Sequence, residues 1–432
     1  GNDRQLGLWG WYLANRLVAN NSMPVLLING AVGGTRIDQH RPNPAGRGLP
    51  GTGNVYSIYA DLYNRVTNAR LNHGIRGLFW HQGEQNQGSG GIDPDYDYKF
   101  YQQYFVDISA AWKQDFPNLR NYYVFQIWPA ACGDTSRNDQ LREVQRTLPR
   151  LYSNMKIMST HGIVPGSGCH YVPAGYQVFS DLIGPLVEQD VYGVMPAAKL
   201  TAPNLQQAYF TTPAKNEIAL VFDQNIAWNP GAPTMLFLAN AAGATSGTVS
   251  SGSATGNTIK LQVSGATSAA TITYLKGLVS WNQANILYGS NGIAALTFAD
   301  VPIGTLSPYE TWAGGSFANA FTDTAATSDP DGDSQTNQEE FAFGLDPTSG
   351  SSVNPITQQL AGGVFKYTRT ANSGLTYKVY YSTDLSGWTL DAAATQTPAA
   401  AVGGVETVTV TLAAAAPSNG KLFVRVEATQ VP

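Results

Sequence analysis

The residues best suited to chemistry are a histidine and two polar side chains that follow a short apolar run. His170 is one of only five histidines and stands in a turn before a predicted helix. Gln82 and Glu84 come directly after the apolar residues 77–80, which read as a buried strand. A histidine whose pKa lies near neutrality can act as general base for a hydroxyl nucleophile. Glu84 either orients His170 or braces its own loop.

A pair of glycines follows another apolar run. Gly33 and Gly34 come after residues 23–29 (MPVLLIN), which read as a short buried strand. Glycine lets backbone N–H groups approach a ligand closely, and such donors can stabilise an oxyanion together with the Gln82 amide. Because ligands bind at the carboxyl ends of parallel strands, we expect these stretches to meet there.

Trp80, His81 and Tyr171 are the candidate contacts for a substrate at this position. Aromatic rings stack on sugars, although such residues more often pack in the core. Cys132 and Cys169, the two cysteines of the chain, both lie in loop sequence near the proposed site. A disulfide between them would fit an oxidising compartment, and the alternative is two unpaired small hydrophobic residues.

A different chemistry is expected in residues 329–340 (DPDGDSQTNQEE). Oxygen-bearing residues fall at positions one, three, five, seven, nine and twelve of this loop: Asp329, Asp331, Asp333, Gln335, Asn337 and Glu340. A twelve-residue loop with this spacing wraps a hard cation, and we expect structural Ca²⁺. Ser334 stands where the sharp turn usually has Gly. The alternative is an acidic, solvated linker.

The expected type of secondary structure changes along the chain. Strand and helix signals alternate up to residue 195, which predicts a three-layer α/β domain with a flavodoxin-like parallel sheet. Short alternating segments separated by turns predict two antiparallel β-sandwiches. We therefore predict a multidomain chain: an α/β domain at 1–195, a β-sandwich at 196–310, a linker with the calcium loop at 311–352, and a second β-sandwich at 353–432.

The composition of the chain excludes some classes of binding partner. Only 13% of the residues are charged and the formal net charge is −5, without a Lys/Arg cluster, so neither nucleic acid nor an anionic membrane is expected. No apolar run is long enough to span a bilayer. The first residues, GNDRQ, resemble neither a signal peptide nor an initiator start, so we expect a longer precursor.

Three stretches resemble the SGNH hydrolase superfamily: GAVGGTRI at 30–37, WHQGEQN at 80–86 and GCHYVPAGY at 168–176. The similarity is greatest to the branch of sialate O-acetylesterases and acetylxylan esterases, and it covers about the first 195 residues. It implies that His170 is the catalytic base and that Gly33 or Gly34 and Gln82 line the oxyanion hole. The calcium-loop segment and the sandwiches resemble modules of secreted bacterial proteins.

The sequence departs from this family at two points. The family's Gly-x-Ser-Asn nucleophile motif is absent, so we expect the serine on a segment that precedes residue 1. Ser167 stands where the family has the Asp of its Asp-x-x-His pair, which shifts the role of the acid to Glu84 or leaves a Ser-His dyad.

These features predict a secreted or cell-surface carbohydrate O-acetylesterase that acts on acetylated polysaccharide or sialic acid and needs no cofactor for catalysis. The alternative is a catalytically inactive structural or glycan-binding surface protein on an esterase-like scaffold. Self-assembly is compatible with either hypothesis.

Overall fold

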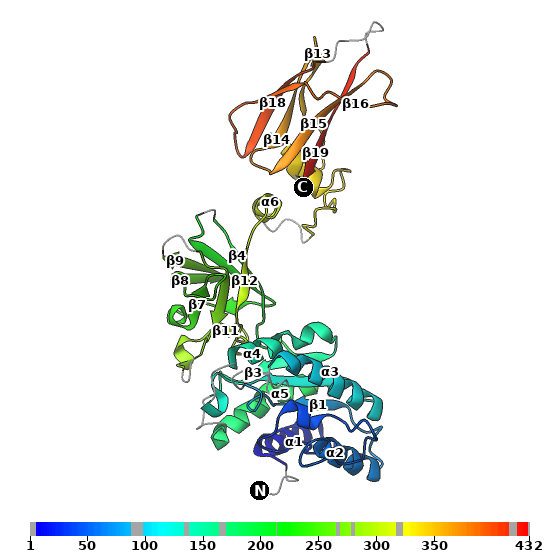
Figure 1. The fold of residues 1–432 in the computed structure, drawn as a ribbon, viewed down its shortest axis with the longest axis vertical. Helices are drawn as coiled ribbons and strands as arrows, with labels where there is room; N and C mark the ends of the chain where they lie inside the picture. Colours follow the sequence, from blue (N-terminus) through cyan, green and yellow to red (C-terminus); the bar gives the residue numbers. More distant parts are fainter. Residues whose placement is uncertain are drawn as a thin grey trace. The chain divides into compact units, whose positions relative to one another are not determined.

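The computed structural model divides the chain into two compact units, Gly1–Gly304 and Thr305–Pro432. Figure 1 shows the elements of each unit. The structure describes residues 6–87, 98–133, 138–163, 170–212, 214–264, 268–277, 281–316, 323–413 and 421–430. No helix among the described residues is long and apolar enough to cross a membrane.

The first part of unit 1 is an α/β domain with three parallel strands in the order β1-β2-β3. Its elements are α1 (Leu8–Asn21), α2 (Ser57–Asn68), β1 (Gly77–Trp80), α3 (Tyr98–Asp115), β2 (Asn121–Gln126), α4 (Asn138–Thr147), β3 (Met155–Ser159) and α5 (Pro173–Tyr192). The predicted alternation of strands and helices is therefore present. Helix α1, which the sequence analysis did not predict, packs against α5.

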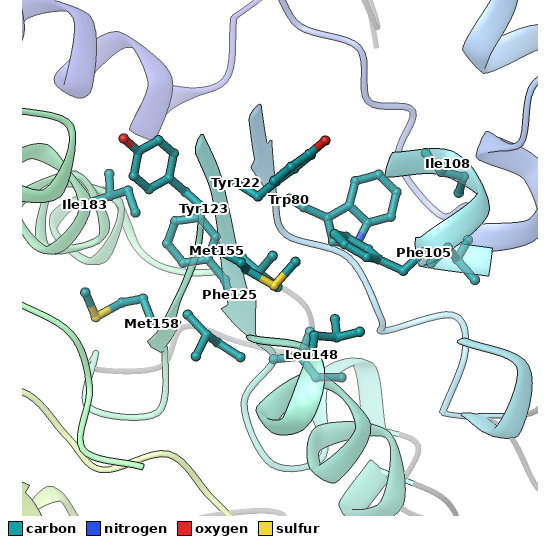
Figure 2. Close-up of a cluster of buried hydrophobic side chains, with 14 of the residues drawn as sticks. Trp80, Phe105, Ile108, Tyr122, Tyr123, Phe125, Leu148, Met155, Met158 and Ile183 are labelled. Atoms are coloured by element: carbon teal, nitrogen blue, oxygen red, sulfur yellow. The ribbon is translucent and has the colours of Figure 1, made fainter. Parts of the chain in front are cut away.

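Side chains that alternate along the strands cover both faces of this sheet. On one face, Trp80 of β1 contacts Phe105 and Trp112 of α3. On the other face, Phe125 of β2 stacks on Phe179 of α5 with ring centroids 4.1 Å apart. Figure 2 shows Trp80 beside Phe105, with Phe125 projecting away from them. The expected burial of a parallel sheet on both faces is confirmed.

The strand predicted at residues 23–29 is wrong. This segment has no strand pairing, and Leu26 within it is 65% exposed. A strand needs a neighbouring backbone with which to form hydrogen bonds. No described strand pairs with this segment, and β1 likewise lies at the end of its sheet. Both segments instead line one cavity of about 1200 Å³.

The second part of unit 1, for which an antiparallel β-sandwich was predicted, is β-rich and forms a seven-stranded sheet in the order β7-β10-β12-β4-β5-β9-β8. Its strands are β4 (Leu205–Phe210), β5 (Glu217–Phe222), β7 (Leu236–Ala239), β8 (Thr248–Thr255), β9 (Thr258–Ser264), β10 (Thr271–Tyr274) and β12 (Val301–Thr305). A two-stranded sheet joins β6 (Ile226–Ala227) to β11 (Tyr288–Gly289).

Buried hydrogen bonds join the two parts of unit 1. Gln126, at the end of β2, donates from Nε2 to the carbonyl of Thr297 and accepts from the Thr297 N–H, both at 2.9 Å. Arg142 of α4 is buried, and its guanidinium donates to Asp139 and to the carbonyl of Leu275 at 2.6 and 2.9 Å. The α/β domain and the seven-stranded sheet thus share a polar interface.

Unit 2 is a β-sandwich with two helices. Its sheets have the orders β13-β14-β18-β17 and β16-β15-β19. The elements are α6 (Pro308–Ser316), α7 (Asn337–Phe343), β13 (Ile356–Ala361), β14 (Val364–Thr370), β15 (Leu375–Ser382), β16 (Thr389–Leu390), β17 (Thr395–Pro398), β18 (Val405–Thr411) and β19 (Phe423–Gln430). Residues of both sheets form one apolar core, which includes Phe365, Tyr367, Val379 and Val408.

The interface inside unit 1 predicts a large effect for one substitution. Arg142→Ala should lower the free energy of unfolding of unit 1 by about 3 kcal/mol, because it leaves Asp139 and the Leu275 carbonyl without their buried partner. Urea denaturation followed by tryptophan fluorescence measures this loss. Arg150→Ala, at an exposed position, should change the value by less than about 0.5 kcal/mol. Equal losses in both variants would contradict the role of the interface.

Candidate active site

One cavity in unit 1 collects the residues that the sequence analysis selected. It is lined by the apolar segments 24–28 and 77–80 and by α1 and α5. The predicted site residues on its wall are Gly33, Gly34, Trp80, His81, Gln82, Glu84, His170 and Tyr171, and Cys132 joins them. The structure therefore brings three distant stretches of sequence to one place, at the carboxyl end of β1.

His170 is exposed and lies just before α5. Its Nδ1 atom lies 3.4 Å from the hydroxyl of Tyr176, in the first turn of that helix. Its other nitrogen, Nε2, has no hydrogen-bond partner among the described residues, and the role of His170 as general base stays a prediction. Ser167, where the family's acid would stand, lies outside the described residues.

Glu84 has a different histidine as its neighbour. Its Oε1 atom lies 3.7 Å from Nε2 of His81, and both side chains are partly buried. Among the described residues, no hydrogen bond or ion pair joins Glu84 to His170. The structure thus favours the bracing role for Glu84 over the orientation of His170. The nearby Glu84 charge adds to burial, the larger cause, in raising the pKa of Tyr171.

Gln82 links two loops. Its Nε2 donates to the carbonyl of Thr35 at 3.1 Å and to Oδ1 of Asn86 at 2.8 Å. Oδ1 of Asn86 also accepts from the N–H of Ile37 at 2.9 Å. Both amide hydrogens of Gln82 are therefore engaged within the protein, so in this arrangement it positions the glycine loop and does not face an oxyanion. This differs from the donor role that the sequence analysis assigned to it.

Gly33 and Gly34 lie in a turn on the cavity wall. The backbone N–H groups of Gly33 and Gly34 have no hydrogen-bond partner among the described residues, and Gly34 adopts a φ of +72°. A β-carbon at either position would meet no atom within 4 Å. Gly33 and Gly34 thus lie on the cavity wall with open space around them, and their role as oxyanion donors stays a prediction.

The sequence analysis missed the support behind Gln82. The Gln82 carbonyl accepts from the Tyr101 hydroxyl and from Nε2 of Gln145, both at 2.8 Å. Oε1 of Gln145 accepts from the N–H of Ile127 at 3.0 Å. The sequence could have indicated this buried support, because Asn138, Arg142 and Gln145 recur at helical spacing. They form a buried polar stripe on α4.

Trp80 and Tyr171 belong to the core. They are 6% and 7% exposed, and Trp80 donates from Nε1 to the Tyr101 hydroxyl at 3.0 Å. The Tyr171 ring lies 4.3 Å from the Trp128 ring. The core-packing alternative therefore fits them better than sugar stacking does. His81, which is partly buried and lines the cavity, stays a candidate substrate contact.

Cys132 lies in the short 3-10 turn η2 (Ala131–Gly133) on the cavity wall. It is disulfide-bonded. Cys169, the partner expected from the sequence, lies outside the described residues, so the pairing stays a prediction.

The acidic loop of unit 2 is a candidate metal site. Carboxylate oxygens of Asp329, Asp331 and Asp333 lie within 4.8 Å of one another. Burial, followed by the charges of these three residues, raises the pKa of Glu340 to about 7. Ser334 adopts a φ of +76°, so the loop makes its sharp turn without the usual glycine.

The chain is similar to known carbohydrate esterases. Residues 4–175 match the family model of carbohydrate esterases described as sialic acid-specific acetylesterases. A search of curated proteins found no match. Among solved structures, a novel carbohydrate acetylesterase from Xanthomonas citri is similar with a TM-score of 0.50 and 17% identity. The alignment covers 67% of this chain and 64% of that one.

The family match confirms the resemblance that the three sequence stretches predicted, over less than half of the chain. The structural likeness, at this identity, shows a shared fold. This chain spans 64% of the length of the solved acetylesterase.

Buried His40 predicts a pH effect on stability. It contacts the Thr35 hydroxyl at 2.9 Å, and burial lowers its pKa from 6.5 to about 4. Between these two pKa values, His40 binds a proton in the unfolded chain but stays neutral in the folded chain. The free energy of unfolding therefore falls as the pH drops from 6.5 towards 4, by about 3 kcal/mol in all. Unfolding free energies measured across this range should fall less steeply in His40→Gln.

The matched control is His73→Gln, which replaces an exposed histidine and should keep the slope of the parent protein. His161 is also buried, with a pKa lowered to about 3, and contributes a loss of the same sign to every variant. If His40→Gln and the parent show the same pH dependence, burial of neutral His40 does not account for the loss.

Proposed function

We propose that this chain carries most of a carbohydrate O-acetylesterase, with His170 as general base and Gly33 and Gly34 as oxyanion donors. The observation that carries the proposal is the cavity that brings these residues together. The family match over residues 4–175 and the fold shared with a carbohydrate acetylesterase support the same class of reaction.

In the proposed mechanism, a serine hydroxyl attacks the carbonyl carbon of an acetyl ester while Nε2 of His170 takes its proton. The negative charge that forms on the carbonyl oxygen is stabilised by the N–H groups of Gly33 and Gly34. The C–O bond to the sugar then breaks, and His170 returns the proton to the sugar oxygen. Water, activated by the same histidine, hydrolyses the acetyl-serine and releases acetate.

We propose that the serine arrives on a β-strand contributed by a segment that precedes residue 1. The exposed backbone edge of β1 and segment 24–28, which pairs with no described strand, line the same cavity, and a parallel strand placed there would pair with both. The lining is largely apolar, with Val25, Leu27, Leu78 and Phe79 among its side chains. A strand that runs parallel to β1 would end near Gly33, Gly34 and His170.

The substrate proposed is an acetylated glycan, either a polysaccharide or sialic acid. The match to a family of carbohydrate esterases that are sialic acid-specific acetylesterases supports this choice. A secreted or cell-surface location fits the disulfide at Cys132, since disulfides persist in oxidising compartments. The proposed catalysis requires no metal.

The role of His170 is tested in the natural precursor by acetate release from acetylated xylan and from O-acetylated sialic acid. His170→Ala should reduce kcat/KM about a thousand-fold, the range expected for loss of a general base. His73→Ala, which removes an exposed histidine that does not itself line the cavity, should retain the parent activity. An active His170→Ala would refute the assignment, and an inactive precursor would favour the non-catalytic scaffold.

The strand proposal is tested by amide hydrogen exchange in the natural precursor and in the chain that begins at residue 1. Amides within residues 25–28, and those amides of residues 77–80 that do not pair with β2, should exchange at least ten-fold more slowly in the precursor, because the added strand supplies their hydrogen-bond partners. The amides of β3 (Met155–Ser159), which pairs with β2 on its inner side, serve as the internal control. Equal exchange at residues 77–80 in both proteins would rule out the strand.

A further inference from the structure

The acidic loop of unit 2 is wrapped around one of its own carboxylates. Oδ1 of Asp329 accepts from the N–H groups of Gly332 and Asp333 at 2.8 and 3.2 Å, and its Oδ2 accepts from the N–H of Ser334 at 2.9 Å. Gly332 and Ser334 both adopt a φ of +76°. These turns bring the carboxylates of Asp329, Asp331 and Asp333 together.

Several oxygen atoms of this loop are buried without a partner. Both carboxylate oxygens of Glu340 and of Asp331, one oxygen of Asp333, and Oδ1 of Asn337 are shielded from solvent and accept no hydrogen bond among the described residues. Glu340 and Asn337 are 0% exposed. A solvated acidic linker would leave these groups in water, so the structure contradicts that alternative.

The carboxylate of Glu339, next to Glu340 in the sequence, does have hydrogen-bond partners. Oε2 of Glu339 accepts from the N–H and from the hydroxyl of Thr336, both at 2.8 Å, and so caps the first turn of α7. The lack of partners is therefore specific to the residues at ligand positions and is not a general property of acidic residues in this loop.

No basic residue neutralises the cluster. The sequence has no Lys, Arg or His between Lys276 and Lys366, and no ion pair reaches residues 329–340 among the described residues. Buried carboxylates without a counter-charge are strongly unfavourable unless they are protonated or bind a cation. Repulsion of this kind contributes to the raised pKa values of Asp331 and Glu340, after burial itself.

From this geometry we propose that residues 329–340 form a Ca²⁺ site, with side-chain oxygens of Asp329, Asp331, Asp333, Asn337 and Glu340 and the carbonyl of Gln335 as ligands. Oxygen donors alone select a hard cation. A flexible loop that offers six or more oxygens, including a terminal glutamate able to bind through both oxygens, suits Ca²⁺ better than Mg²⁺, which demands a near-ideal octahedron.

The site lies where it can stabilise unit 2. Glu340 is followed by Phe341, whose ring lies 5.5 Å from the rings of Tyr309 and Trp312 on α6. The next residue, Ala342, accepts a hydrogen bond at 2.6 Å from the hydroxyl of Tyr377 on β15. The ion would therefore fix the start of α7, while the rest of the helix is anchored on α6 and on the sandwich.

The site is tested on the whole chain, first treated with chelator and then titrated with CaCl₂ by isothermal calorimetry. One Ca²⁺ should bind per chain, at least ten-fold more tightly than Mg²⁺. Glu340→Gln should weaken Ca²⁺ binding about 100-fold, since it removes a charged ligand. Glu339→Gln, which removes the same charge one residue away and keeps the helix cap, should bind as the parent does.

Thermal unfolding gives an independent readout. In chelator, Glu340→Gln should be at least as stable as the parent, because it relieves an unpaired buried charge. In millimolar Ca²⁺ the order should reverse, because only the parent gains stability from the ion. Asp331→Asn should show the same reversal and replaces Glu340→Gln if that variant does not fold. The proposal fails if the parent binds no Ca²⁺, or if ligand variants bind it as tightly as the parent.

Discussion

Hydrogen bonds made by buried amide side chains hold the loops of the candidate active site in register. Gln82 donates to the Thr35 carbonyl and to Asn86, while its own carbonyl is held by Tyr101 and Gln145. Each such bond contributes only about 1 kcal/mol net, yet a partner left unsatisfied in the interior costs more. The members of the network therefore depend on one another, and the positions of the glycine loop and of the β1 end follow from it.

This network also explains which part of the site the sequence could predict. The stretch around Gln82 ends a strand and the stretch around His170 begins a helix, and the sequence could predict that such ends meet at one edge of the sheet. The stretch around Gly33 lines the same cavity although the strand expected before it does not form. The role of each side chain within the site could not be predicted. Whether the Gln82 amide faces solvent or Thr35, and whether Glu84 lies beside His81 or His170, depends on contacts between residues far apart in the chain.

The fold, too, could be predicted from the sequence only in part. The strand predicted at the apolar run 77–80 is present as β1, which pairs with β2. The run at residues 23–29 has the same composition, yet it forms no strand because no described strand lies beside it. Hydrophobic pattern measures the tendency to be buried, whereas a strand also requires a neighbour. Residues 24–28 and β1 instead line one cavity.

The acidic loop of unit 2 is the opposite case, because nearly all of its geometry is local. Its candidate ligands fall within twelve residues, and the turns at Gly332 and Ser334 that gather them are made by hydrogen bonds to Asp329 in the same loop. Spacing alone could therefore predict where the oxygens meet. What the sequence could not show is burial: Glu340 is 0% exposed, and the ring of Phe341 beside it packs on α6. That enclosure separates a cation site from an acidic surface loop, since it removes the water that would otherwise solvate the carboxylates.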